Sequence, residues 1–397
     1  MSRTMGKVSS SPVEVAAGLS PTEAKAGLSP AEVEASASWL ASAQLDSGMV
    51  PWYRGGHADP WNHVEAAMAL AVAGRWPEVG RAFEWLASKQ LPDGSWCRFY
   101  LPDGVEDARR DPNTCAYVAV GSLWCCLLDA AAPAPAARGA AAPPQAVLGA
   151  AAPAPGAAAP GPRSVVDASW PVVERALHWC LRYQRPSGEV AWSVSPDGVA
   201  SSFALLAANS SLQHSFKAAS LLAKRLGSDH PEWEAAALRV ASAISGKPHL
   251  FAPKDRWAMD WYYPVLTGAI GAEAARERLL SRWPEFVMEG LGVRCVADHD
   301  WVTAAETAEC AMAANRAGLR RQAEALLAWT RHLRDPDDGA YWTGCAHPQC
   351  VRFPSGQKST YSTAAVLIAD HVVYGRSPAA GIFGGSAPAS LLVDQLD

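Results

Sequence analysis

Residues 39–52 (WLASAQLDSGMVPW) and 85–96 (WLASKQLPDGSW) decide the fold, because they repeat one pattern 46 residues apart. Each stretch has a tryptophan, a glutamine a few residues later, a turn glycine and a closing tryptophan. Residues 179–192 (WCLRYQRPSGEVAW) and 329–342 (WTRHLRDPDDGAYW) follow the same order more loosely. We call the four stretches the turn motif. A repeat of this length indicates one supersecondary unit whose apolar face is buried only against its neighbours.

Helical signals alternate on either side of the turn motif. One set of segments opens with proline in the first turn and keeps apolar residues at helical spacing, which is typical of outer, half-buried helices. The other set is rich in Ala, Leu and Val nearly all round, which is typical of helices buried on every side. The predicted outer helices are 30–44, 77–90, 170–184, 231–245, 272–287 and 318–333, and the inner ones are 60–73, 112–129, 210–226, 260–270, 302–315 and 359–373. Six such hairpins predict an all-α fold, an (α/α)6 toroid.

The toroid is expected to span residues 30–375 as a single domain. Residues 1–29 are polar and small and are predicted to be a flexible N-terminus. Residues 131–163 are almost wholly Ala, Pro and Gly, so they are predicted to be a disordered insertion between two units. Residues 376–397 are predicted to be a flexible tail.

Composition excludes several classes of partner. The net charge is −5 and the pI is about 6.1, which disfavours nucleic acid and anionic membrane surfaces. No apolar run is long enough to span a bilayer, and the start of the chain has no secretory apolar segment. The nine cysteines form no regular framework. We therefore expect a reduced, cytoplasmic protein, while its oligomeric state stays open.

Polar and aromatic side chains gather at the starts of the predicted inner helices. The N-termini of six inner helices in a toroid converge on one mouth, so these side chains are expected to line a common site. The predicted substrate-binding residues are His57, Trp61, Asn62, His63, Asp111, Asn113, Tyr117, His214, Trp257, Trp261, Tyr262, Tyr263, Trp301 and Tyr361. A plain helix cap, worth about 1 kcal/mol, explains Asp59, Asp111 or Asp260 individually as well, but not the aromatic and histidine neighbours that recur.

Glu306 is the sharpest single candidate, because it lies one turn into an Ala-rich inner helix. A buried carboxylate is costly unless it is paired or used. A structural ion pair with Arg256 or Arg294 would explain it. Otherwise a desolvated glutamate has a raised pKa and can act as a general acid.

An acid and a second carboxylate across an aromatic cleft form the arrangement used in glycoside hydrolysis. Tryptophan and tyrosine faces suit the apolar faces of sugars. We therefore predict Glu306 as the general acid and Asp59 as the base, with Asp260 or Asp111 as substitutes, acting on an oligosaccharide or polysaccharide. We expect no cofactor and no metal at the mouth.

Three other motifs carry less weight. Residues 335–338 (DPDD) match the acid motif of terpene cyclisation, but they occupy the turn of the fourth turn motif. Cys345-x-His347-x-x-Cys350 could contribute zinc ligands, although no second ligand pair lies at finger-like spacing. Ser210 and Ser211 lie near His214 without a nucleophile elbow, so substrate contacts are favoured over a nucleophile.

The turn motif resembles the QW-type repeats of squalene cyclases and protein prenyltransferase β subunits. The resemblance covers about residues 30–375 and implies an α/α toroid that could shelter an isoprenoid. An aspartate-rich diphosphate motif is not found in the sequence.

The polar segments GGHADPWNHVEAAMAL, RWAMDWYYPVL and WVTAAETAEC resemble an actinobacterial family of methylmannose polysaccharide hydrolases, which are endomannanases. Six-hairpin glycosidases share this toroid. The resemblance implies hydrolysis of an α-linked sugar with Asp59 and Glu306 as the carboxylate pair. Two alternatives remain: a prenyltransferase or terpene-cyclase-like enzyme, and a carbohydrate-binding toroid without catalysis.

Overall fold

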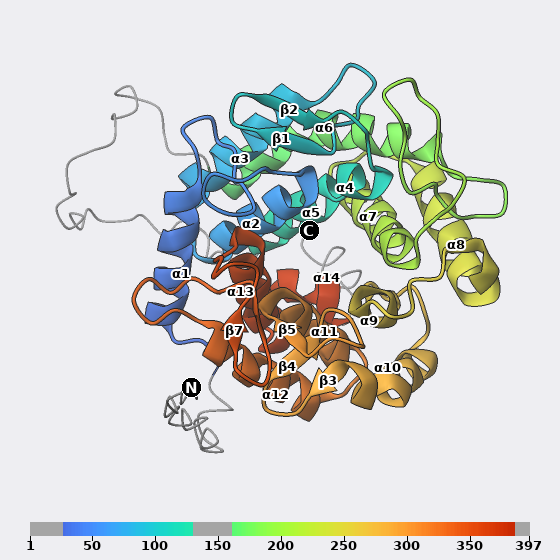
Figure 1. The fold of residues 1–397 in the computed structure, drawn as a ribbon. Helices are drawn as coiled ribbons and strands as arrows, with labels where there is room; N and C mark the ends of the chain where they lie inside the picture. Colours follow the sequence, from blue (N-terminus) through green and yellow to red (C-terminus); the bar gives the residue numbers. More distant parts are fainter. Residues whose placement is uncertain (1–26, 130–160, 386–397) are drawn as a thin grey trace, which may run out of the picture.

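The computed structural model describes residues 27–129 and 161–385, whose helices form two concentric rings (Figure 1). The outer ring contains α1 (Pro30–Ala43), α3 (Trp76–Lys89), α6 (Pro162–Leu181), α8 (Pro231–Gly246), α10 (Ala272–Phe286) and α12 (Arg320–Trp329). The inner ring contains α2 (Pro60–Val72), α4 (Pro112–Ala116) continued by α5 (Val118–Asp129), α7 (Leu206–Arg225), α9 (Ala258–Leu266), α11 (Ala304–Arg316) and α13 (Thr360–Val373). Helix α13 packs against α2 and closes the ring. The predicted (α/α)6 toroid is confirmed.

Burial separates the two rings as the sequence pattern predicts. In α13 every residue from Ser362 to Val373 is buried, because other helices surround it. In α3 the buried positions include Val79, Phe83 and Leu86, which share one face. Among the described helices, none is long and apolar enough to cross a membrane.

In the first three turn motifs, the glutamine joins one outer helix to the next: α1 to α3, α3 to α6 and α6 to α8. Its Nε2 donates to the carbonyl of its own turn glycine and to a carbonyl of the next outer helix. The pairs of acceptors are Gly48 and Glu78 for Gln44 (3.0 and 2.9 Å), Gly94 and Val172 for Gln90 (2.9 and 2.9 Å), and Gly188 and Ala236 for Gln184 (3.0 and 3.0 Å). The turn motif is therefore a structural tie.

The turn glycine is required for close approach as well as for backbone conformation. Gly94 has φ 98°, and a Cβ placed on it would lie 2.4 Å from the carbonyl oxygen of Arg175 in α6. The fourth turn motif has Arg334 in place of glutamine, and Arg334 donates to the Glu32 carbonyl of α1 at 3.5 Å. This last tie brings the outer ring back to its first helix.

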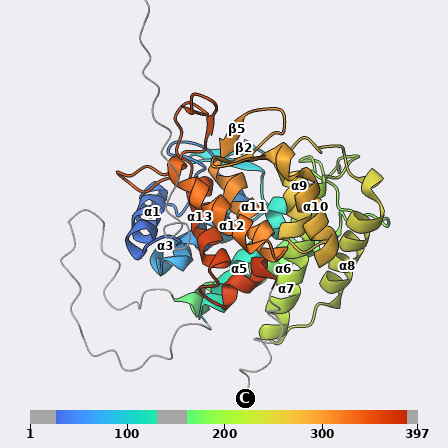
Figure 2. The ribbon, with the colours of Figure 1, turned by 90° about the horizontal axis from the view of Figure 1, so that it is seen from below.

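Small sheets and short helices complete the fold. The strands are β1 (Phe99–Leu101), β2 (Gly104–Asp107), β3 (Val287–Met288), β4 (Gly292–Arg294), β5 (Trp301–Thr303), β6 (Gly344–Ala346) and β7 (Val351–Arg352). Strands β1 and β2 pair with each other, and β3 to β7 form an antiparallel sheet in chain order. Figure 2 shows β2 and β5 at the same end of the ring. An all-helical pattern did not predict these strands, which lie in the connections that surround the mouth.

The helix ends depart from the prediction at two places. Helix α6 begins at Pro162, earlier than the predicted residue 170, and residues 130–160 of the predicted insertion lie outside the described residues. Residues in the predicted tail are instead helical: η3 (Pro378–Ala380) and α14 (Gly381–Gly384) bury Ile382 and Phe383. The Phe383 carbonyl accepts a hydrogen bond from Arg316 at the end of α11, so α14 lies at the C-terminal ends of the inner helices. The 3-10 helices η1 (Pro248–Leu250) and η2 (Thr330–Leu333) follow α8 and α12.

Candidate functional site

A cavity of about 370 Å³ opens where the inner helices begin. Its lining contains carboxylates, amides and aromatic rings, with a smaller apolar patch. The lining residues are Trp52, Asp59, Trp61, Asn62, Glu65, Arg98, Phe99, Asp111, Asn113, Thr114, Trp192, Leu205, Ala207, Ala208, Met259, Ala305, Glu306, Glu309 and Tyr361. Asp59, Asp111 and Glu306, which come from three different inner helices, therefore share one site.

Asp59 is the N-cap of α2 and is almost completely buried. One carboxylate oxygen accepts from the backbone N–H of Asn62 at 2.9 Å. The other accepts from Asn62 Nδ2 at 2.6 Å and from Trp52 Nε1 at 2.5 Å. Burial raises the pKa of Asp59, and these donors oppose the rise. The cap alone does not account for the Trp52 bond, which fixes the carboxylate toward the cavity.

Glu306 lies in the first turn of α11, with its side chain partly exposed to the cavity. The hydroxyl of Thr303, the N-cap residue, donates to one of its oxygens. The alternative of a structural ion pair is excluded for both arginines, since Arg256 pairs with Asp298 and Arg294 pairs with Asp300, each at 2.8 Å. Among the described residues, no lysine or arginine forms a salt bridge with Glu306.

Asp111 caps α4 in the same way that Asp59 caps α2. Its carboxylate accepts from the backbone N–H of Asn113 at 2.9 Å. Burial raises the pKa of Asp111 to about 7, opposed by the cation of Arg98. The Asn113 side-chain oxygen is buried in the lining and has no hydrogen-bond partner among the described residues, so it can accept a bond from a ligand.

Aromatic rings form much of the cavity wall. Trp52 meets Phe99 and Tyr361 edge to face, with ring centroids 5.7 and 5.4 Å apart. The guanidinium of Arg98 lies over both Phe99 and Trp192. Trp52 and Trp192 are the closing tryptophans of the first and third turn motifs. Neither residue is among the predicted site residues, although the closing position that they share in the repeat is a signal that could have placed them at the site.

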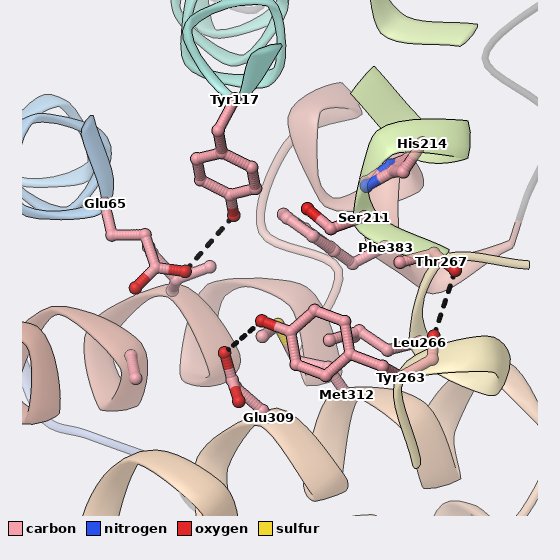
Figure 3. A pocket seen from close by; sticks show the side chains of 12 residues that line it. Glu65, Tyr117, Ser211, His214, Tyr263, Leu266, Thr267, Glu309, Met312 and Phe383 are labelled. Carbon is pink, nitrogen blue, oxygen red and sulfur yellow. Dashed lines mark hydrogen bonds between the residues drawn. The ribbon is translucent and has the colours of Figure 1, made fainter. Parts of the chain in front are cut away.

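Two glutamates that are not among the predicted site residues line both the floor of this cavity and a smaller adjoining pocket, which Figure 3 shows. Glu65 accepts from Trp61 Nε1 at 3.0 Å and from the Tyr117 hydroxyl at 3.2 Å. Glu309 accepts from the hydroxyls of Tyr262 and Tyr263, the latter at 2.8 Å. We call Glu65 and Glu309 the floor pair.

Burial is the main cause of the raised pKa values of the floor pair. The pKa of Glu309 rises to about 7, and that of Glu65 rises well above its ordinary value, with the negative charge of Glu309 as the second cause. The floor pair therefore holds protons near neutral pH.

Two predicted histidines lie outside the cavity. His63 is fully buried between neighbouring elements, where its ring accepts from the Val50 N–H at 3.0 Å and donates to the Ala82 carbonyl at 2.9 Å. His214 contacts the Ile382 carbonyl at 3.2 Å, near α14 and away from the mouth. Burial lowers the pKa of His63 to about 4 and that of His214 to about 3, so both are neutral structural side chains.

Helix α9 contributes less to the mouth than predicted. Asp260 accepts from the Ala207 backbone N–H at 3.2 Å and is not among the cavity-lining residues. Trp261 stacks on Phe286 and faces the outer ring. Tyr262 and Tyr263 act beneath the cavity, as donors to Glu309.

Three further predicted residues lie at the edge of the site. His57 forms an ion pair with Glu106 at 2.9 Å and stacks on Phe99, which itself lines the cavity. Trp257 is 42% exposed, and Trp301 contacts Phe353 edge to face. None of the three lines the cavity directly.

The two remaining motifs of the sequence are resolved differently. The DPDD segment is a turn, as predicted, since Lys358 pairs with both Asp335 and Asp338. The segment around Cys345 does assemble possible metal ligands, because His332 joins Cys345, His347 and Cys350.

Comparisons with known proteins agree with this geometry. No family model matches the chain. The fold is similar to that of an α-amylase from Clostridium perfringens (TM-score 0.59, 8% identity, 86% of this chain and 98% of that one). It is also similar to a solved glycosidase (TM-score 0.61, 12% identity, 90% and 99%) and to a D-mannose isomerase (TM-score 0.61, 11% identity, 88% and 97%). These solved structures establish the toroid alone.

A relative in sequence is more specific than the solved structures. The chain is 41% identical over 350 residues to the "MMP endo-(1,4)-3-O-methyl-alpha-D-mannosidase" of Mycolicibacterium hassiacum, with 88% of each chain covered. This similarity gives no support to the prenyltransferase reading of the turn motif. The protein belongs to the family of this endomannosidase and is a glycoside hydrolase.

Proposed function

We propose that the protein cleaves internal α-1,4 linkages of a polysaccharide built from 3-O-methylated mannose, with Glu306 and Asp59 as its catalytic pair. The proposed substrate is that of the relative from Mycolicibacterium hassiacum, an endo-(1,4)-3-O-methyl-α-D-mannosidase. The observation that carries the catalytic assignment is that Asp59 and Glu306, from α2 and α11, line one cavity together. We call them the wall pair.

The two carboxylates suit different roles. Glu306 accepts hydrogen bonds from the Thr303 hydroxyl and the Cys295 thiol, and it lines the cavity with its side chain partly exposed. It can therefore protonate the glycosidic oxygen as the C1–O bond breaks. Asp59 accepts three hydrogen bonds that favour its ionised form. An ionised Asp59 takes a proton from the attacking water, whose oxygen bonds to C1. One chain fragment then carries the free C1 hydroxyl and the other carries the hydroxyl protonated by Glu306.

The lining suits a methylated sugar. Trp52, Trp61 and Trp192 offer flat apolar faces, while Asn62 and Asn113 offer amide groups for hydroxyls. Leu205, Ala207, Ala208 and Met259 add an apolar patch that can accept O-methyl groups without stranding a polar atom. An unmethylated mannan would place hydroxyl groups against this apolar patch, where they would have no hydrogen-bond partner.

The test is product analysis with purified protein and a 3-O-methylmannose polysaccharide. We expect oligosaccharides of intermediate length, and no detectable release by Glu306→Gln or Asp59→Asn. Glu273→Gln and Asp229→Asn, at exposed positions on the outer surface, are the matched controls and should retain activity. Full activity in both wall-pair variants would overturn the assignment, and release of monosaccharide alone would overturn internal cleavage.

We also propose a cytoplasmic location. The described residues contain no disulfide, which suits a reducing compartment. Subcellular fractionation of the native host would place the protein, and recovery outside the cell would contradict this.

A further inference from the structure

Four side chains with metal-binding atoms meet outside the catalytic cavity. They are His332 in η2, Cys345 in β6, and His347 and Cys350 in the connection from β6 to β7. Their ligand atoms all lie within 4.8 Å of one another. We propose that this cluster binds one zinc ion as a structural Cys2His2 site that secures the sheet beside the active site.

The distances fit a common ion. Cys345 Sγ lies 3.1 Å from His347 Nε2 and 3.8 Å from His332 Nε2. Zinc bonds of about 2.3 Å to sulfur and 2.0–2.1 Å to nitrogen place tetrahedral ligand atoms roughly 3.3–3.8 Å apart. The two sulfur atoms are 2.7 Å apart, so the Cys350 side chain would swing outward by about 1 Å to share the ion.

The ring of His332 is already oriented as a ligand. Its Nδ1–H donates to the Trp329 carbonyl at 2.6 Å, which fixes the tautomer and leaves the Nε2 lone pair facing Cys345. A backbone carbonyl that holds the non-ligating nitrogen is the usual outer contact of a zinc-bound histidine. A histidine with a purely structural role would not need its second ring nitrogen to face a thiol, whereas a zinc ligand would.

The donor set also suits zinc. Two cysteine sulfurs and two imidazole nitrogens are the ligands of a structural Cys2His2 zinc site.

The site is closed, so its role is structural. Four protein ligands fill a tetrahedral zinc, whereas a catalytic zinc keeps one position open. Cys345 pairs with Val302 of β5, and β5 ends at Thr303, whose hydroxyl holds Glu306. A zinc ion would therefore join η2, β6 and the β6–β7 connection behind the strand that leads to the proposed general acid.

A disulfide between Cys345 and Cys350 is the competing explanation. It would use the two sulfurs and leave the aligned Nε2 atoms of His332 and His347 without a function. The two explanations make different predictions for His332, because a zinc site needs its imidazole as a ligand and a disulfide does not.

The experiment measures metal in the full-length protein purified under reducing conditions without a histidine tag. We expect elemental analysis by inductively coupled plasma mass spectrometry to give one zinc ion per chain. After zinc removal, titration with Co2+ should give the thiolate-to-cobalt absorption and the visible bands of a tetrahedral site at one equivalent.

Variants then separate zinc from a disulfide. His332→Ala should lower zinc affinity at least tenfold, and Cys350→Ser should lower it likewise. His178→Ala and Cys97→Ser are the matched controls outside the cluster and should still bind one zinc. A chelator should lower the melting temperature of the wild type and of both controls more than that of His332→Ala.

Two results would overturn the proposal. One is a Cys345–Cys350 disulfide in peptide mapping of protein made with zinc supplied, together with no bound metal. The other is a wild-type protein whose thiols are free but which shows no cobalt bands. This second result is obtained with the wild-type protein alone, so it does not depend on whether a variant folds.

Discussion

The wall pair and the floor pair are both carboxylate pairs on α2 and α11, and both face the same cavity. Their surroundings differ. Glu65 and Glu309 together accept hydrogen bonds from one tryptophan and three tyrosines. Glu306 accepts from the hydroxyl of Thr303 and the thiol of Cys295.

The difference shows that burial of a carboxylate and its exposure to the cavity are separate properties. The floor pair has clearly raised pKa values, yet its donors hold it in a fixed network with Trp61. Perturbed pKa values are found in structural networks as well as in active sites. The partial exposure of Glu306 to the cavity therefore favours the wall pair for catalysis, and we propose the floor pair as support for the aromatic wall.

The largest expected effect separates the two pairs by activity. Glu306→Gln should lower kcat by about a thousandfold with little change in KM, because a general acid contributes about 10²–10⁴-fold. Glu309→Gln should lower kcat by less than about tenfold, since an amide can still bond both tyrosines. Steady-state kinetics on the polysaccharide measure both. If Glu309→Gln lowered kcat more than Glu306→Gln does, the floor pair rather than the wall pair would be assigned to catalysis.

The floor pair should have its main effect on stability as a function of pH. The pKa of Glu309 is raised to about 7 in the folded protein, so its contribution is present below pH 4.5 and is lost as pH rises through 7. Glu309→Gln should reduce the fall in unfolding free energy between pH 5 and 8 by up to about 3 kcal/mol. Denaturant unfolding measures this. Glu273→Gln should keep the wild-type slope, and an unchanged slope in Glu309→Gln would contradict the buried, protonated pair.

A smaller effect tests how the wall pair is tuned. Trp52→Phe keeps an aromatic ring but removes a donor that lowers the pKa of Asp59. The acidic limb of the kcat/KM profile should move upward by less than about one pH unit, with a severalfold loss of activity. Trp96→Phe, at the equivalent position of the second turn motif, has its Nε1 bonded to the Leu86 carbonyl and should leave the profile unchanged. Equal shifts in both would show that the effect is not local to Asp59.

The wall pair was predictable from sequence, whereas the floor pair was not. Asp59 precedes a proline at a helix start and Glu306 interrupts an alanine-rich helix, so both stand out in the chain. Glu309 lies in the same helix, within a segment whose alanine-rich pattern predicts burial. Its role depends on how α9 and α2 face α11, and that relation is a property of packing between distant segments.

Helix phase and helix length explain the misplaced residues. His63 lies next to Asn62, but one step along a helix turns a side chain by about 100°, which takes it from the cavity to Ala82. Helix α7 begins at Leu206 rather than at residue 210, so His214 lies about 12 Å from the helix start instead of about 6 Å and contacts the Ile382 carbonyl. The ring of helices was predictable from the repeat. The turn glutamines that hydrogen-bond neighbouring outer helices also lie at a fixed spacing within each local turn.

The most direct test of the central claim uses a substrate that needs no general acid. A nitrophenyl glycoside of a 3-O-methylmannose oligosaccharide has a good leaving group, so protonation of the departing oxygen contributes little. With Glu306 as acid and Asp59 as base, Glu306→Gln should regain most of its activity on this substrate, and Asp59→Asn should stay inactive. Rescue of Asp59→Asn but not of Glu306→Gln would contradict the assignment of the wall pair.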